Sequence, residues 1–320
     1  MLARAEGVTA FAAVATEVFR KAKNGRQFLD RLETEAGVKT ALLSQDEEAR
    51  IGFETASALA STPENVASYD SGGGSFQIAS LDANGALRTY NASLGKTVAL
   101  EMLVVGVLGK TLGETPNPVS KTTADALIAR LTAELAPAPA WLRGHANVVA
   151  IGGSNSIFRL CTVRRGVVES SLSWCRRGFR VARPVSARDA THRRGAAAAS
   201  TRLPPRRRRD SLPRRRRDLA APAPPPRSRI AQAIAGATTF SRADAAAALD
   251  AVLDRTDDAL RAAPWWPAVG CAKKEAPYTA GKLCLLNAVL AHLGIEKVEY
   301  KSTNGSCPGM VVSERLFPMG

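Results

Sequence analysis

The stretch Asp70-Ser71-Gly72-Gly73-Gly74-Ser75 decides the expected fold, and it interrupts an extended segment around residues 65–78. Consecutive glycines let the backbone approach a ligand closely and turn several N–H groups toward it. Such a nest binds phosphate oxygens, and an aspartate beside it can hold a divalent cation that bridges those oxygens. The alternative interpretation is a hairpin turn or a flexible linker, which is what a lone glycine triplet usually forms.

Strand and helix patterns alternate on both sides of this loop. Residues 8–19 fit either a strand that enters a turn or part of a helix. Short apolar runs predict strands at 38–43, 87–94, 147–151 and 297–300, and helical spacing predicts helices at 24–32, from 46 onward, and at 97–108, 120–135, 242–262 and 279–293. A second glycine turn, Gly152-Gly153-Ser154, follows the strand at 147–151. Alternating elements with glycine turns at strand ends indicate an α/β fold.

Composition fits a soluble globular protein without a membrane span. Apolar residues make up 45% and charged residues 23% of the 320 residues. The longest apolar stretch, 98–109, contains Glu101 and is shorter than the roughly 20 residues that a spanning helix needs. The five cysteines are scattered and contain no C-x-x-C pair, which disfavours a zinc knuckle or a disulfide framework. We therefore expect a cytoplasmic protein.

The net charge of +15 comes from one segment. Residues 161–229 contain 20 arginines, no lysine and four acidic residues, which gives +16 and leaves −1 for the rest of the chain. Arginine runs and clustered prolines predict that residues 161–235 form a disordered Arg/Pro/Ala-rich insert. Three interpretations stay open: an arginine tract that binds nucleic acid, a solvated insert without a function of its own, or an artefact of the gene model.

Four motifs in a fixed order give the glycine loop its context. They are residues 15–24, with Thr16 and Arg20, then Glu47-Glu48-Ala49-Arg50, then the loop at 70–77, and then the turn at 152–154. This ordered set resembles the exopolyphosphatase/guanosine pentaphosphate phosphohydrolase (Ppx/GppA phosphatase) family. The resemblance covers about residues 8–160 and, more weakly, 238–317.

The resemblance implies an α/β fold of the actin-like, sugar-kinase and heat-shock-protein superfold, with ribonuclease H-like lobes. The family opens with an Asp-x-Gly-Ser-Asn loop that has no counterpart before Ala15, so we expect an N-terminal truncation and an incomplete first lobe. The expected domains are the remaining C-terminal half of lobe one at 1–62, lobe two with the phosphate loop at 63–160 and 236–320, and the insert or artefact at 161–235.

The resemblance also implies a role for each motif residue. Glu48 matches the general base that activates water, with Glu47 as the fallback. Asp70 matches the position that holds Mg²⁺. Substrate phosphates would lie against Thr16, Arg20, Gly72, Gly73, Gly74 and Ser75. Gln77 stands where the family has glutamate, which removes one charge beside the expected metal.

Three functions of different class follow from these observations. The leading one is a phosphoanhydride hydrolase that releases terminal phosphate from inorganic polyphosphate or guanosine pentaphosphate with Mg²⁺. The second is a catalytically impaired homologue that binds phosphate or nucleotide, which Gln77 and the missing first motif favour. The third is an arginine-tract nucleic-acid binder. For the leading function we expect no membrane or nucleic-acid partner, and a homodimer is compatible with it.

Overall fold

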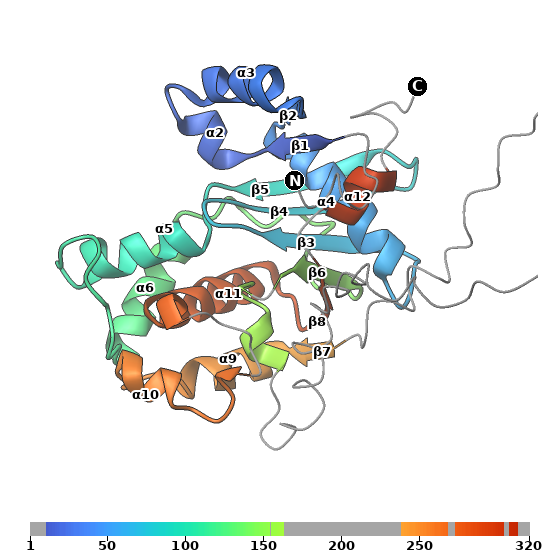
Figure 1. The fold of residues 1–320 in the computed structure, drawn as a ribbon. Helices are drawn as coiled ribbons and strands as arrows, with labels where there is room; N and C mark the ends of the chain where they lie inside the picture. The colour runs from blue at the N-terminus through green and yellow to red at the C-terminus, as the bar shows by residue number, and fades with distance from the viewer. Residues whose placement is uncertain (1–10, 154, 163–237, 268–272, 304–306, 313–320) are drawn as a thin grey trace, which may run out of the picture.

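A six-stranded mixed sheet forms the centre of the computed structural model, which describes residues 11–153, 155–162, 238–267, 273–303 and 307–312 (Figure 1). The strands follow the order β5 (Leu87–Ala92), β4 (Phe76–Leu81), β3 (Ala67–Ser71), β6 (Val148–Gly152), β8 (Lys297–Ser302) and β7 (Thr238–Ser241). β3, β6 and β8 are parallel, whereas β4, β5 and β7 pair antiparallel with their neighbours. Most of the expected insert, residues 163–235, lies outside the described residues.

The central strand β6 is buried on both of its faces. Val148 and Ala150 belong to the large core cluster, while Val149 and Ile151 belong to a smaller cluster on the opposite face. Successive side chains of a strand point to opposite faces, so a strand covered on both sides is expected to be apolar throughout. This burial explains why the apolar run at 147–151 predicts the strand correctly.

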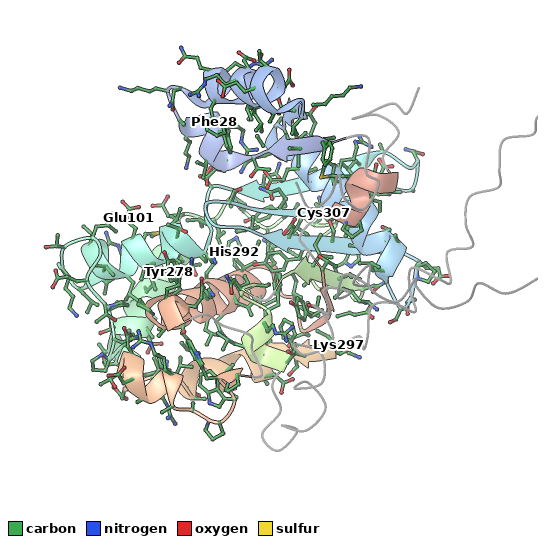
Figure 2. The ribbon with its side chains drawn as sticks, viewed as in Figure 1. Phe28, Glu101, Tyr278, His292, Lys297 and Cys307 are labelled. Carbon is green, nitrogen blue, oxygen red and sulfur yellow. The ribbon has the colours of Figure 1, made fainter. Side chains whose placement is uncertain are left out.

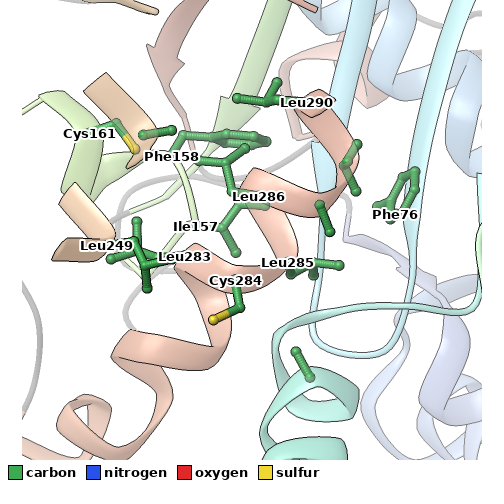
Figure 3. Close-up of a cluster of buried hydrophobic side chains, with 14 of the residues drawn as sticks. Phe76, Ile157, Phe158, Cys161, Leu249, Leu283, Cys284, Leu285, Leu286 and Leu290 are labelled. Atoms are coloured by element: carbon green, nitrogen blue, oxygen red, sulfur yellow. The ribbon is translucent and has the colours of Figure 1, made fainter. Parts of the chain in front are cut away.

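The helix α11 (Thr279–Leu293) belongs to the large core cluster, and Figure 3 shows Leu283, Leu286 and Leu290 of this helix among the buried side chains. It is apolar around most of its circumference and packs against α5 (Lys96–Glu101), α6 (Lys121–Ala133) and α9 (Arg242–Asp250). Such an all-round apolar helix is typically buried inside a protein. Its 15 residues span the range predicted from the sequence. Within the described ranges, no helix combines the length and the apolarity that crossing a membrane requires.

The opposite face of the sheet is covered by α4 (Gln45–Leu59), which contacts β3, β4, β5 and β6. α4 begins with a capping box, because the Ser44 hydroxyl accepts from the Glu47 amide and the Glu47 carboxylate accepts from the Ser44 amide. The short helix α12 (Cys307–Val312) packs on α4, where the Gly309 amide donates to the Thr55 hydroxyl at 2.8 Å. The Ser44 cap therefore fixes where α4, and with it Glu48, begins.

A separate parallel pair of strands precedes α4. β1 (Ala12–Ala15) and β2 (Lys39–Leu42) are joined through α2 (Glu17–Lys21) and α3 (Gly25–Ala36), in the upper blue part of Figure 1. The open expectation for residues 8–19 therefore resolves, over the described part, into a strand followed by a short helix. The predicted domain boundary at residue 62 stays a prediction.

One of the expected helices is wrong in its length. The helix expected at 242–262 is two helices, α9 and α10 (Asp257–Arg261), because Asp254 adopts a left-handed backbone with φ 56° and the Thr256 hydroxyl caps a new helix. In the helix that begins after Asn24, Phe28 is 49% exposed and its ring contacts the ring of Phe19.

Candidate active site

The predicted phosphate loop is the turn between β3 and β4. Asp70 pairs with Gln77 across this hairpin, and the Gly72 amide donates to the Ser75 carbonyl at 2.9 Å. Gln77 Nε2 donates to the buried Ser75 hydroxyl at 3.0 Å. Gly72 and Ser75 thus close the turn. The Gly73 and Gly74 amides make no hydrogen bond to the described part of the chain, so they remain as donors for an anion.

Both glycine turns lie at the same edge of the sheet. β3 and β6 are parallel, with Asp70 paired to Ile151, so the loop and the turn at Gly152 follow adjacent strand ends. Tyr300 Oη donates to the Gly152 and Gly153 carbonyls at 2.8 and 3.1 Å, which fixes the second turn. The carboxyl ends of parallel strands are where open α/β sheets bind ligands. Ser154 of this turn is outside the described residues.

Gly95 supports the loop from behind, immediately before α5. The Lys96 and Thr97 amides donate to the Gly72 and Gly73 carbonyls at 3.1 and 2.8 Å. This contact is so close that a β-carbon at residue 95 would overlap the Gly73 backbone. The backbone on both sides of the contact is therefore held in one conformation.

Changing Gly95 to Ala should therefore displace the loop. Because the clash is with backbone, a side-chain rotation does not relieve it, and we expect a loss of about 1–3 kcal/mol in unfolding free energy together with weaker phosphate binding. Chemical denaturation and titration with tripolyphosphate measure both effects. The control is Gly281→Ala on α11, because a β-carbon there would meet the Ala99 backbone at an ordinary 3.5 Å. Equal behaviour of the two variants contradicts the prediction.

Arg20 and Glu48 form an ion pair between α2 and α4. Arg20 Nη1 donates to Glu48 Oε2 at 3.0 Å and to the Leu43 carbonyl at 2.7 Å. The two side chains are 21% and 15% exposed. Arg20 Nη2 is buried and finds no hydrogen-bond partner among the described residues. An unsatisfied guanidinium N–H at a partly buried site is a donor suited to a phosphate oxygen.

Burial raises the pKa of the Glu48 carboxyl above its usual value. The hydrogen bond and the charge of Arg20 lower that pKa, while the charges of Asp70 and Glu17 raise it further, so the net direction is upward. A carboxylate with a raised pKa is a stronger base. The adjacent Glu47 differs, because its hydrogen bonds to Ser44 lower its pKa and commit it to the helix cap. The structure thus separates the two neighbouring acids.

Asp70 could hold a magnesium ion only if a bound phosphate substrate and waters supply the other metal ligands. It lies half-buried at the end of β3, where its Oδ2 would be 3.9 Å from a β-carbon on Gly52 of α4. Among the described residues, no group of three or more His, Cys, Asp or Glu is arranged to hold a metal. Mg²⁺ is usually held by one or two carboxylates and completed by waters and substrate phosphates. One aspartate beside a phosphate loop is therefore an adequate protein contribution.

Thr16 is the cap residue of α2, but its side chain makes no capping hydrogen bond. Its carbonyl accepts from the Phe19 and Arg20 amides at 3.0 and 3.1 Å, which starts the turn that carries Arg20. Thr16 therefore positions Arg20 through the backbone. Its expected contact with phosphate stays a prediction.

Sequence reasoning missed a buried charged cluster behind the loop. Lys282 of α11 and Glu275 are 1% and 4% exposed, and Lys282 Nζ lies 2.6 Å from Glu275 Oε2. Lys96 Nζ is 3.5 Å from the same oxygen and lies 5.6 Å from the ring centre of Tyr278, which Figure 2 labels beside α5. Although burial raises the pKa of Glu275, its hydrogen bond to Lys282 and the charges of both lysines lower it overall. The one sequence feature that could have indicated this cluster is a lysine inside the apolar helix at 279–293.

Glu17 was also missed, although it adjoins Thr16 in a motif that was identified. A β-carbon on Gly74 would overlap the Glu17 carboxylate, so this acid lies directly against the phosphate loop. Its charge acts on Glu48, and it forms an ion pair with Lys21. Nothing in the local sequence pattern distinguishes it from an ordinary acid in the first turn of a helix.

Comparison with known proteins confirms the family resemblance over part of the chain. Residues 2–135 match the model of the Ppx/GppA phosphatase family. No curated protein matches the sequence significantly. The Ppx/GppA family member from Aquifex aeolicus is 15% identical, with 98% of this chain and 76% of that chain covered at a TM-score of 0.57. An exopolyphosphatase from Cytophaga hutchinsonii is 12% identical, with 97% and 76% covered at a TM-score of 0.54.

An exopolyphosphatase-like protein of known structure is likewise similar, with 16% identity, a TM-score of 0.53, and 95% of this chain and 74% of that chain covered. Identities this low show the fold and not the activity. The predicted α/β fold of the actin-like superfold is therefore confirmed.

Proposed function

We propose that this chain is a phosphoanhydride hydrolase that releases terminal phosphate from inorganic polyphosphate or guanosine pentaphosphate. The observation that carries the proposal is the Arg20–Glu48 pair, which brings together a carboxylate of raised pKa and a guanidinium N–H that has no hydrogen-bond partner among the described residues. The family match over residues 2–135 supports a phosphatase independently of this geometry.

The chemistry requires little covalent work from the protein. A water oxygen attacks the terminal phosphorus, the bond from phosphorus to the bridging oxygen breaks, and Glu48 accepts the proton of the water. The shortened phosphate chain departs with the bonding electrons. Arg20 Nη2 and the Gly73 and Gly74 amides donate hydrogen bonds to the phosphate oxygens. Magnesium held by Asp70 and the phosphates would neutralise part of their charge.

A direct assay tests this function. Purified chain is incubated with inorganic polyphosphate or guanosine pentaphosphate in the presence of Mg²⁺, and free phosphate is measured with time. Release from either substrate supports the proposal. Binding without release favours the second candidate, an impaired phosphate-binding homologue, for which the observation is Gln77 in place of a glutamate. Failure to bind either compound contradicts both functions.

The raised pKa of Glu48 predicts the acid side of the pH profile. The base is active only when deprotonated, so kcat/KM should fall as the pH decreases through the folded-state pKa of this carboxyl. Because burial raises that pKa, the acid limb should lie at higher pH than the ordinary range of glutamate, about 4.3. Initial rates across pH 4–9 measure the limb. A profile that stays flat down to the ordinary glutamate pKa would rule out this assignment.

A further inference from the structure

Glu17 brings a negative charge to the place where a substrate phosphate is expected. It is the first residue of α2, and its carboxylate lies so close to Gly74 that a β-carbon on that glycine would overlap it. The side chain is only 14% exposed. Its charge raises the pKa of Glu48, so the acid also faces the proposed base. The loop that is built to receive an anion therefore already contacts one.

The interactions that hold Glu17 in this position are weak. Its ion-pair partner Lys21 is one turn further along α2 and 62% exposed. A pair of this spacing with an exposed cation contributes little to stability, because solvent screens the cation and both side chains lose freedom. The Glu17 side chain can therefore leave the loop at small cost and follow Lys21 toward solvent.

We propose that Glu17 is a specificity-determining residue, an internal anion that occupies the phosphate loop and must turn away before a phosphate group binds. This inference rests on the proposed function, because it takes the loop at Gly73 and Gly74 as the phosphate site. Two anions in contact at a partly buried site repel each other. Glu17 thus lowers the affinity of the loop for every phosphate, including the single phosphate that is the reaction product. A substrate with several phosphates offsets this loss through its other contacts, whereas the released single phosphate cannot.

Calorimetric titration with tripolyphosphate in metal-free buffer tests the inference. Glu17→Gln keeps the shape of the side chain and removes its charge, so it should bind at least about tenfold more tightly than the unaltered protein. Glu17→Asp withdraws the carboxylate by one methylene and should show an intermediate gain. The control is Glu35→Gln on α3, which removes a glutamate charge from another i,i+4 pair, with Arg31, that is exposed on both sides, and it should bind like the unaltered protein.

The outcomes separate this inference from the proposed function. Tripolyphosphate binding that is equal or weaker in Glu17→Gln overturns the role of Glu17 and leaves the phosphate site intact. Binding weakened by Glu17→Gln only when Mg²⁺ is added makes Glu17 a metal-linked ligand, which also overturns the inference. No binding by any of the four proteins contradicts the phosphate site itself, and the inference fails with it. Thermal unfolding of each variant verifies that all four are folded.

Discussion

Replacing Glu48 by glutamine should reduce phosphate release by about 10²- to 10⁴-fold, which is the usual contribution of a positioned general base. Glutamine has nearly the same shape and keeps an oxygen that can accept from Arg20 Nη1, so the contact between α2 and α4 is retained. What it loses is the ability to take a proton from water. The expected signature is a large fall in kcat with little change in KM, measured by phosphate release at saturating polyphosphate.

The neighbouring acid supplies the matched control. Glu47→Gln changes the same chemical group one residue earlier, but Glu47 is bound to Ser44 in the cap of α4. Because glutamine also serves in a capping box, we expect nearly full activity and at most about 1 kcal/mol of lost stability. If Glu47→Gln abolishes release while Glu48→Gln retains it, the two acids have been assigned the wrong way round.

The sequence predicts a helix or strand correctly where the residues of that element alone determine its conformation. The acidic start of the helix that carries Glu48 was recognisable because acids favour the first turn, and the structure adds the Ser44 cap. The buried strand β6 and the apolar helix α11 were recognisable because a fully enclosed element shows an unbroken apolar run. These elements place both glycine turns at one sheet edge, so the candidate site follows from the sequence in outline.

Features that depend on tertiary contacts could not be predicted from the sequence. The break between α9 and α10 leaves the apolar spacing intact, because Leu249 and Leu260 are both buried on either side of it. The strand β7 is only four residues long and exists through its pairing with β8. A four-residue edge strand has too few positions to show an alternating pattern.

The charged contacts around the site could not be predicted either, because they too depend on tertiary packing. Glu17 and Gly74 are far apart in sequence, and only the packing of α2 against the loop brings them together. Lys282 and Glu275 have the spacing of two helical turns, but a proline at 277 interrupts the segment between them. Charges in such contacts become informative only when their burial is known.

Replacing Glu275 by alanine should destabilise the fold more than any surface change. Its side chain is 5% exposed and faces the side chain of Lys282, which is 2% exposed, and Lys96 Nζ at 3.5 Å. Removing the shared carboxylate leaves the Lys282 ammonium buried without its counter-charge, and breaking a buried pair in this way typically costs about 3–5 kcal/mol. We therefore expect a Tm lower by roughly 10 °C or more, measured by calorimetry or by circular dichroism.

Three further variants provide a surface control and distinguish a charge effect from a loss of packing. Asp125→Asn breaks the exposed pair with Lys121 and should change stability by no more than about 0.5 kcal/mol. Combining Glu275→Gln with Lys282→Met removes both members of the closest pair and fills the volume of the lysine with an apolar side chain. This double variant should recover much of the stability that Glu275→Gln alone loses, because no buried ammonium remains at position 282. If the double variant is less stable than Glu275→Gln, then packing around Lys282, and not its uncompensated charge, accounts for the loss.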